Sequence, residues 1–252
     1  MALPGASDFE QKNVEKDDQI KAMTAVVEQI KAHMTQSKRK GVTLGDDSTD
    51  PEVGKLIRQA FCDVLIPILN YGFKSFKLFG KHHFWDFLEK LLDDQLEKSN
   101  DGSFSVEKQS AKYNLCRAVA IIADIKLMEK NNDMRLRAFI CYGLNVQSLH
   151  RWMQVLRQNE VLSKKFFEPW SYVQSDHSMQ ELLQSLQPLA SHTFRLALDY
   201  EVRSLPLAAA PTRDRPDSVA GWPGVAQVAS LNVRVPGRAA PKVPAPRGGG
   251  RG

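Results

Sequence analysis

An all-α fold is the class that this sequence predicts, and three observations support it. Several segments space their apolar residues at alternating steps of three and four, as one face of a helix does. No segment shows the sustained alternation of apolar and polar residues that is typical of a strand. Clusters of Gly, Pro, Asn and Asp separate the periodic segments. We therefore predict a flexible N-terminus over 1–11, one compact domain of about seven helices over 12–205, and a disordered tail over 206–252.

The first predicted helix covers residues 10–38 and is mostly polar. Its apolar residues form a single sparse stripe, made of Ile20, Met23, Val27, Ile30 and Met34. Two heptads are too few for a stable coiled coil by themselves. The segment 12–38 is therefore either the first helix of the domain or the stump of a longer coiled coil that pairs with a partner helix.

The second predicted helix begins at Asp50 and Pro51, because Asp is a favoured N-cap and Pro is favoured in the first turn. Pro67 lies inside it and predicts a kink, since proline has no amide hydrogen to donate. The helix is expected to end at 70–72. Helical spacing then recurs within 73–94 and over 109–129, 134–159, 160–167, 178–190 and 191–205. Helix 134–159 is apolar on most sides, which places it at the centre of the domain.

The tail differs sharply in composition from the rest of the chain. It holds 8 of the 13 prolines and 7 of the 15 glycines. Segment 205–252 has seven basic and two acidic residues, a net charge of +5 that equals the charge of the whole chain. The basic balance therefore gives no reason to expect the helical part to bind nucleic acid. Too few apolar residues are present to offset the entropy of ordering, so we predict disorder and suspect an alternative C-terminus joined after Ser204.

The three cysteines indicate a reducing compartment. Cys62, Cys116 and Cys141 are far apart in largely apolar stretches and form no CxxC pair, so we expect buried thiols in a cytoplasmic protein. The N-terminus turns acidic before any apolar run and does not resemble a signal peptide. The longest apolar runs are too short to span a bilayer, so no transmembrane segment is expected.

The residues that usually carry catalysis form no recognisable pattern. No GxSxG, GxGxxG or GxxxxGK[ST] motif is present, and EF-hand spacing is absent. His82 and His83 are neighbours, and adjacent side chains on a helix diverge by roughly 100°, which is unsuited to one metal ion. We expect no enzyme activity, no cofactor and no metal site.

Lysines and phenylalanines interleave after residue 72. Lys74, Lys77 and Lys81 alternate with phenylalanines, a pattern also seen in surfaces that bind single-stranded nucleic acid. We favour phenylalanines that turn inward and lysines that form a positive rim for an acidic protein surface.

Several blocks, in this order, resemble the RUN domain family. They are TLGDDS (Thr43–Ser48), NYGFK (Asn70–Lys74), FGKHHFWDFLEK (79–90), RAFICYGLN (Arg137–Asn145) with Leu149 and Trp152, and KFFEPW (Lys165–Trp170). The resemblance makes segment 12–38 the first helix of the domain. The positions that carry the family pattern are Gly72, Trp85, Ala138, Leu144, Leu149, Phe167, Glu168, Pro169 and Trp170.

What the resemblance implies is a helical adaptor without enzyme activity. RUN domains are associated with small GTPases of the Rab and Rap classes and with motor and membrane-trafficking machinery. We expect a cytoplasmic protein-interaction module that reaches vesicle or organelle membranes through its partner. The alternative is a self-associating scaffold that uses 12–38 and has no GTPase partner. Candidate partner-binding residues are Lys74, Lys77, Lys81 and Arg137, although Arg137 is as readily a structural residue paired within the fold.

The stretch KKFFEPWSYV at 164–173 is either an aromatic binding loop or a corner of the helical fold. Pro169 stops the preceding helix and biases Glu168 away from helical geometry. We favour the corner, with Phe166 and Phe167 turned into the core and Trp170 covering the turn.

Overall fold

The structure is a computed structural model that describes residues 6–39, 51–74, 83–100 and 110–198. The chain divides into two units, Met1–Thr212 and Arg213–Gly252, and every described residue lies in the first. The predictions for the tail, and those for Asp50, Lys77, Lys81 and His82, fall outside the described residues.

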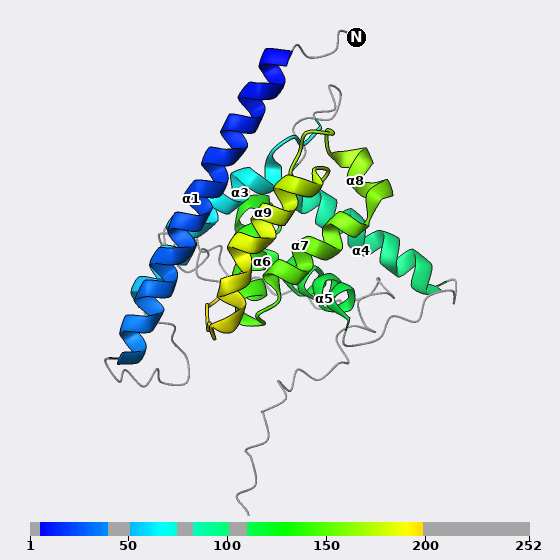
Figure 1. Cartoon of the computed structure of the whole chain (residues 1–252). Coiled ribbons are helices and arrows are strands. Elements are labelled where there is room, and N and C mark those ends of the chain that lie inside the picture. Colours follow the sequence, from blue (N-terminus) through cyan, green and yellow to red (C-terminus); the bar gives the residue numbers. More distant parts are fainter. Residues whose placement is uncertain (1–5, 40–50, 75–82, 101–109, 199–252) are drawn as a thin grey trace, which may run out of the picture. The chain divides into compact units, whose positions relative to one another are not determined.

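The fold is all-α, as predicted, and Figure 1 shows the helices in order. They are α1 Ala6–Arg39, α2 Pro51–Leu56, α3 Cys62–Asn70, α4 Phe84–Asn100, α5 Ala111–Ala123, α6 Asn132–Asn145, α7 Leu149–Gln158, α8 Glu160–Phe166 and α9 Asp176–Leu186. Short 3₁₀ turns cover Lys126–Met128 and Gln187–Ser191. Within the described ranges no strand forms, and no helix is both long enough and apolar enough to cross a bilayer.

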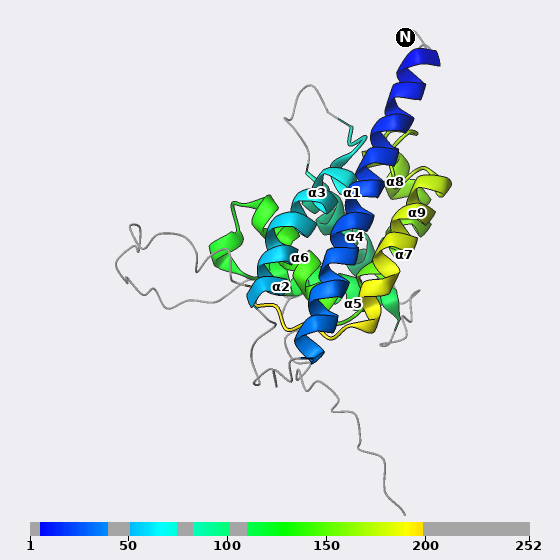
Figure 2. The same ribbon diagram turned by 60° about the vertical axis from the view of Figure 1, so that its left-hand side comes forward.

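Helix α1 lies along the outside of the other helices in both ribbon views (Figures 1 and 2) and packs against α2, α3 and α9. Its predicted apolar stripe faces them: Met23 and Ile30 are fully buried, and Val27 and Met34 nearly so. Burial of one such side chain stabilises a fold by roughly 1.5–3 kcal/mol. The helix begins at Ala6, so residues 6–11, which the sequence assigned to the N-terminal segment, belong to α1. That range holds neither Pro nor Gly.

The segment 51–70 is helical throughout but changes its pitch in the middle. A π-helical turn, Ile57–Phe61, joins α2 to α3, and the helix continues through Pro67 as part of α3. The irregularity that the structure records therefore lies before the proline. Such π turns inside α-helices often occur at functional positions.

The single helix predicted over 134–159 is wrong, because α6 ends at Asn145 and α7 begins at Leu149. Gln147 has a positive φ of 55°. Its amide donates to the Leu144 carbonyl at 3.0 Å, and the Ser148 amide donates to the Gly143 carbonyl at 2.9 Å. This is a Schellman C-cap, with glutamine in the left-handed position that glycine usually takes. The apolar pattern continues across the break because both helices bury their apolar faces in one core.

Two other predicted helices end early or do not form. The helix predicted over 109–129 ends at Ala123, and Leu127 is exposed on the following 3₁₀ turn. The helix predicted over 191–205 is absent over 192–198, and the rest of that range is outside the description. There Phe194 and Leu196 are buried while their neighbours are exposed, which is the alternation of extended chain.

Asn145 holds this extended segment to the end of α6. Its side-chain amide donates to the Leu196 carbonyl at 2.9 Å, and its side-chain oxygen accepts from the Leu196 amide at 2.8 Å. The Asn145 side chain thereby satisfies both backbone groups of Leu196, as a neighbouring strand would do in a sheet.

Candidate functional site

The stretch KKFFEPW meets the segment after α3 in a backbone pairing. The Lys74 amide donates to the Phe166 carbonyl, and the Glu168 amide donates to the Gly72 carbonyl, both at 2.8 Å. Gly72 has a φ of +72°, and a Cβ atom there would lie 2.7 Å from the Cβ of Ser171. Only glycine fits this position without strain. Two segments more than ninety residues apart are thereby held together.

An aromatic cluster lies beneath this pairing. Phe167 is 1% exposed, and its ring meets those of Phe73 and Phe87 edge to face, with centroids 4.7 and 5.1 Å apart. Phe84 contacts Phe167 at 6.1 Å, and Phe166 joins the cluster through Phe73 and Phe87. The phenylalanines on both sides of the corner thus point inward.

The remaining residues of the stretch lie nearer to solvent. Pro169 is exposed, and Glu168 and Trp170 are half-buried. The Lys12 ammonium of α1 sits over the Trp170 ring, 3.8 Å from its centroid. Such a cation–π contact ties the first helix to the turn.

The outer face of the corner is basic. The Lys74 ammonium donates to the Lys164 backbone carbonyl at 2.7 Å. A carbonyl is neutral, so this hydrogen bond does not neutralise the positive charge of Lys74. Lys164 pairs with Glu160 at 2.9 Å on an exposed helical surface, where an ion pair is weak. Lys165 is also exposed. We call Lys74, Lys164 and Lys165 the basic corner.

The basic corner combines a predicted residue with two that were missed. Sequence reasoning singled out Lys74 and the two lysines outside the described residues. It treated Lys164 and Lys165 as flanks of the FFEPW block. The signal available was their position directly before that block, but only the backbone pairing places them beside Lys74.

Arg137 lies elsewhere, on α6. Its guanidinium donates to the backbone carbonyl of Arg58 in the π turn and forms an ion pair with Asp63 of α3. Arg137 therefore links α6 to the irregular part of the second helix.

The other residues of the family pattern belong to the core. Trp85, Ala138, Leu144 and Leu149 are all buried. The Trp85 indole donates to the Glu89 carboxylate at 2.7 Å, and that carboxylate also accepts from the buried Arg135 at 3.1 Å. These positions shape the fold and are not available to a partner.

A buried lysine joins α1 to α9. The Lys16 ammonium donates to the Ser178 hydroxyl at 3.2 Å, and the Tyr172 hydroxyl donates to the Lys16 carbonyl at 2.9 Å. Burial lowers the pKa of Lys16, and the nearby Glu181 carboxylate partly offsets this. Burial, and then Glu15, raise the pKa of Tyr71 to about 12. No pattern in the sequence indicated this cluster.

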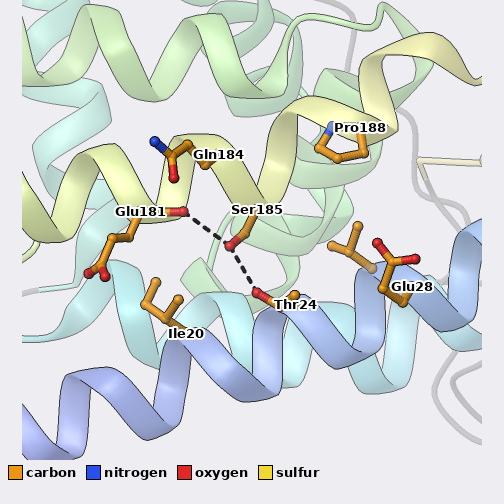
Figure 3. A pocket seen from close by; sticks show the side chains of 8 residues that line it. Ile20, Thr24, Glu28, Glu181, Gln184, Ser185 and Pro188 are labelled. Atoms are coloured by element: carbon orange, nitrogen blue, oxygen red, sulfur yellow. Dashed lines mark hydrogen bonds between the residues drawn. The ribbon is translucent and has the colours of Figure 1, made fainter.

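A shallow groove of about 320 Å³ runs between α1 and α9 (Figure 3). Its lining is Ile20, Thr24, Val27, Glu28, Glu181, Gln184, Ser185 and Pro188. We call it the α1–α9 groove. It shares no residue with the basic corner.

The histidines and thiols show no arrangement for catalysis in the part of the chain that the structure describes. His83 lies 3.1 Å from the Asp133 carboxylate, and burial lowers the pKa of His150. Cys116 is a free thiol whose pKa burial raises to about 11, which disfavours the reactive thiolate. No group of three or more potential metal ligands occurs among these residues.

Comparison with known proteins finds similarity to a small G protein signaling modulator and to two AP-4 complex accessory subunits. It is 28% identical over 173 residues to small G protein signaling modulator 3 of Bos taurus, covering 63% of this chain and 23% of that protein. It is 28% identical over 207 residues to AP-4 complex accessory subunit RUSC2 of Homo sapiens, covering 76% of this chain and 12% of that protein. The mouse AP-4 complex accessory subunit RUSC1 is 26% identical over 191 residues, covering 71% of this chain and 20% of that protein.

The chain thus matches less than a quarter of the length of these relatives. A family model, the RUN domain, matches residues 60–200, which is more than half of the chain. This range includes the corner, the α6 block and most of the core. The chain belongs to the RUN domain family.

Proposed function

We propose that this chain is a non-enzymatic interaction module that docks a small GTPase, or another protein of the trafficking machinery, through the basic corner. The observation that carries the proposal is the backbone pairing that places Lys74 beside α8 and its two lysines. Related proteins are named as a small G protein signaling modulator and as AP-4 accessory subunits, which supports a partner of this class.

The chemistry of the corner suits an acidic protein surface. Its ammonium groups stand on a rigid base, because the aromatic cluster and the Gly72 turn fix the backbone beneath them. Rim charges of this kind act mainly by steering encounter and by selecting the partner, so binding should weaken as salt is added. Lys77 and Lys81 stay candidates for the same rim, and Arg137 stays a candidate with a structural role beside it.

Self-association through 12–38 is the weaker candidate function. The apolar stripe that would pair with a second helix is already buried against α3 and α9. Exposing it again would cost the burial energy of its side chains.

In the docking proposal, the module is cytoplasmic and reaches organelle membranes through its protein partner.

The test is binding of the full chain to a panel of purified small GTPases, each loaded with a GTP analogue or GDP and measured by biolayer interferometry. We expect one class to bind in its GTP form, and the double variant Lys74→Glu/Lys165→Glu to bind at least about tenfold more weakly. Lys130→Glu is the matched control, since it reverses an exposed lysine outside the corner. Unchanged binding by the double variant would show that the basic corner is not the docking surface. No binding across the panel would show that the partner is not a small GTPase.

A further inference from the structure

The two hydroxyls on the floor of the α1–α9 groove, Thr24 and Ser185, are arranged so that they act as hydrogen-bond acceptors toward a ligand. The Ser185 hydroxyl donates to the Glu181 carbonyl at 3.0 Å. A serine hydroxyl has one proton, so in the 3.1 Å contact between Thr24 and Ser185 it is Thr24 that donates. Thr24 has then used its proton and presents only oxygen lone pairs to the groove (Figure 3).

Two carboxylates flank this floor. Figure 3 places Glu181 and Glu28 on opposite sides of the Thr24–Ser185 pair, one from each helix. Glu28 bonds to Lys31 at 2.7 Å, but both side chains are substantially exposed, so a partner cation can compete for this carboxylate. Glu181 lies 3.6 Å from the exposed His177 ring and also near the buried Lys16. A ligand at the floor therefore meets a carboxylate from each helix and needs to bring donors.

The sides of the groove are apolar. Ile20 and Val27 line it from α1, and Pro188 lines it from the 3₁₀ turn after α9. Such walls suit the methylene stem of a long basic side chain whose charged head lies over the acceptors. Among basic side chains, arginine fits best, because its planar head carries five donors and can bond a carboxylate and a hydroxyl together.

We propose that the α1–α9 groove is a second docking surface, which takes an arginine side chain from a segment of a partner protein. The groove and the basic corner have opposite charge and select different chemistry. An acidic segment is repelled by Glu28 and Glu181. The groove proposal therefore stands independently of the GTPase proposal.

The experiment is an NMR titration of the isotope-labelled full chain with the tripeptide acetyl-Leu-Arg-Leu-amide. The control peptide replaces arginine by citrulline, which has nearly the same shape and no charge. We expect saturable shifts of the backbone amides of Thr24, Glu28, Glu181 and Ser185 with the arginine peptide and none with the citrulline peptide.

Variants then test the two carboxylates. Glu28→Gln and Glu181→Gln should each raise the dissociation constant by about fivefold or more, while Glu129→Gln, an exposed glutamate outside the groove, should not change it. Equal binding of both peptides, shifts confined to other residues, no saturable shift at millimolar peptide, or unchanged affinity in both groove variants would each overturn the proposal. Binding of a partner at the basic corner should be the same in all three variants.

Discussion

Replacing Phe167 by alanine tests whether the KKFFEPW stretch is a structural corner. Its ring is 1% exposed and makes edge contacts with three other phenylalanines, at centroid distances of 4.7, 5.1 and 6.1 Å. A binding loop would instead keep its aromatic rings accessible. The substitution removes the ring and leaves the backbone hydrogen bonds from Lys74 to Phe166 and from Glu168 to Gly72 possible.

The expected loss of unfolding free energy is about 4 kcal/mol. Truncation of a buried phenylalanine to alanine costs roughly 3–5 kcal/mol, because transfer energy is lost and a cavity remains. Each edge-to-face pair adds about 0.5–1.5 kcal/mol beyond area burial, and three such pairs favour the upper half of that range. A domain is typically stable by about 5–15 kcal/mol, so the variant should still fold at low temperature.

The assay is urea unfolding of the full chain, followed by far-ultraviolet circular dichroism. The midpoint should fall while the dependence of free energy on urea stays constant, because the same surface is exposed on unfolding. Val161→Ala is the control, since Val161 is 86% exposed on the adjacent α8, and it should change stability by less than about 0.5 kcal/mol. A loss below about 1 kcal/mol for Phe167→Ala would refute the structural assignment.

Further predictions concern the backbone and the titration of the fold. Gly72→Ala should lower the midpoint of thermal unfolding, because the positive φ and the close approach both oppose a Cβ atom. Gly54→Ala should lower it less or raise it, since helical alanine is favoured and the added Cβ meets only the flexible end of a side chain. Asn145→Ala should cost about 1–3 kcal/mol, measured by urea unfolding, because the buried Leu196 backbone loses both partners. Tyr71 has its folded pKa raised to about 12 from 10.0, so the folded state binds more protons between these values. Its contribution to stability is complete below pH 10 and is lost as pH rises toward 12. Tyr71→Phe should flatten that decline in unfolding experiments between pH 9 and pH 12, and an equally steep decline would contradict the assignment.

The sequence predicted correctly those features of the fold that depend on neighbouring residues of one helix. The stripe on α1, the start of the second helix at Pro51 and the end of α3 before Gly72 all follow from local periodicity or local backbone preference. The all-α class follows from the same periodicity, and the RUN family was indicated by the sequence blocks that resemble it. The candidate site followed less directly. Among the three residues of the basic corner, only Lys74 was predicted from the sequence as a partner-binding residue.

Long-range contacts decided what local patterns left open. The apolar spacing runs through Gln147, yet the helix ends just before it. Gln147 takes the left-handed conformation of the Schellman cap, and the Asn145 side chain bonds to the Leu196 backbone. Residues 192–198 have a composition that a helix would accept. Their extended form is held by hydrogen bonds between the Asn145 side chain and the Leu196 backbone. Propensity differences of a few tenths of a kcal/mol per residue are smaller than such tertiary terms.

The sequence by itself thus determined the helical class and most of the residues that are buried, since these depend on spacing along one chain. It also indicated the family, through blocks that resemble the RUN domain. The tertiary structure alone decided which charged side chains become neighbours. Lys74 meets α8 through a pairing across more than ninety residues. Glu28 and Glu181 line the same groove only because α1 packs against α9. Both candidate docking surfaces arise in this way, because a surface is built from segments that no local pattern relates.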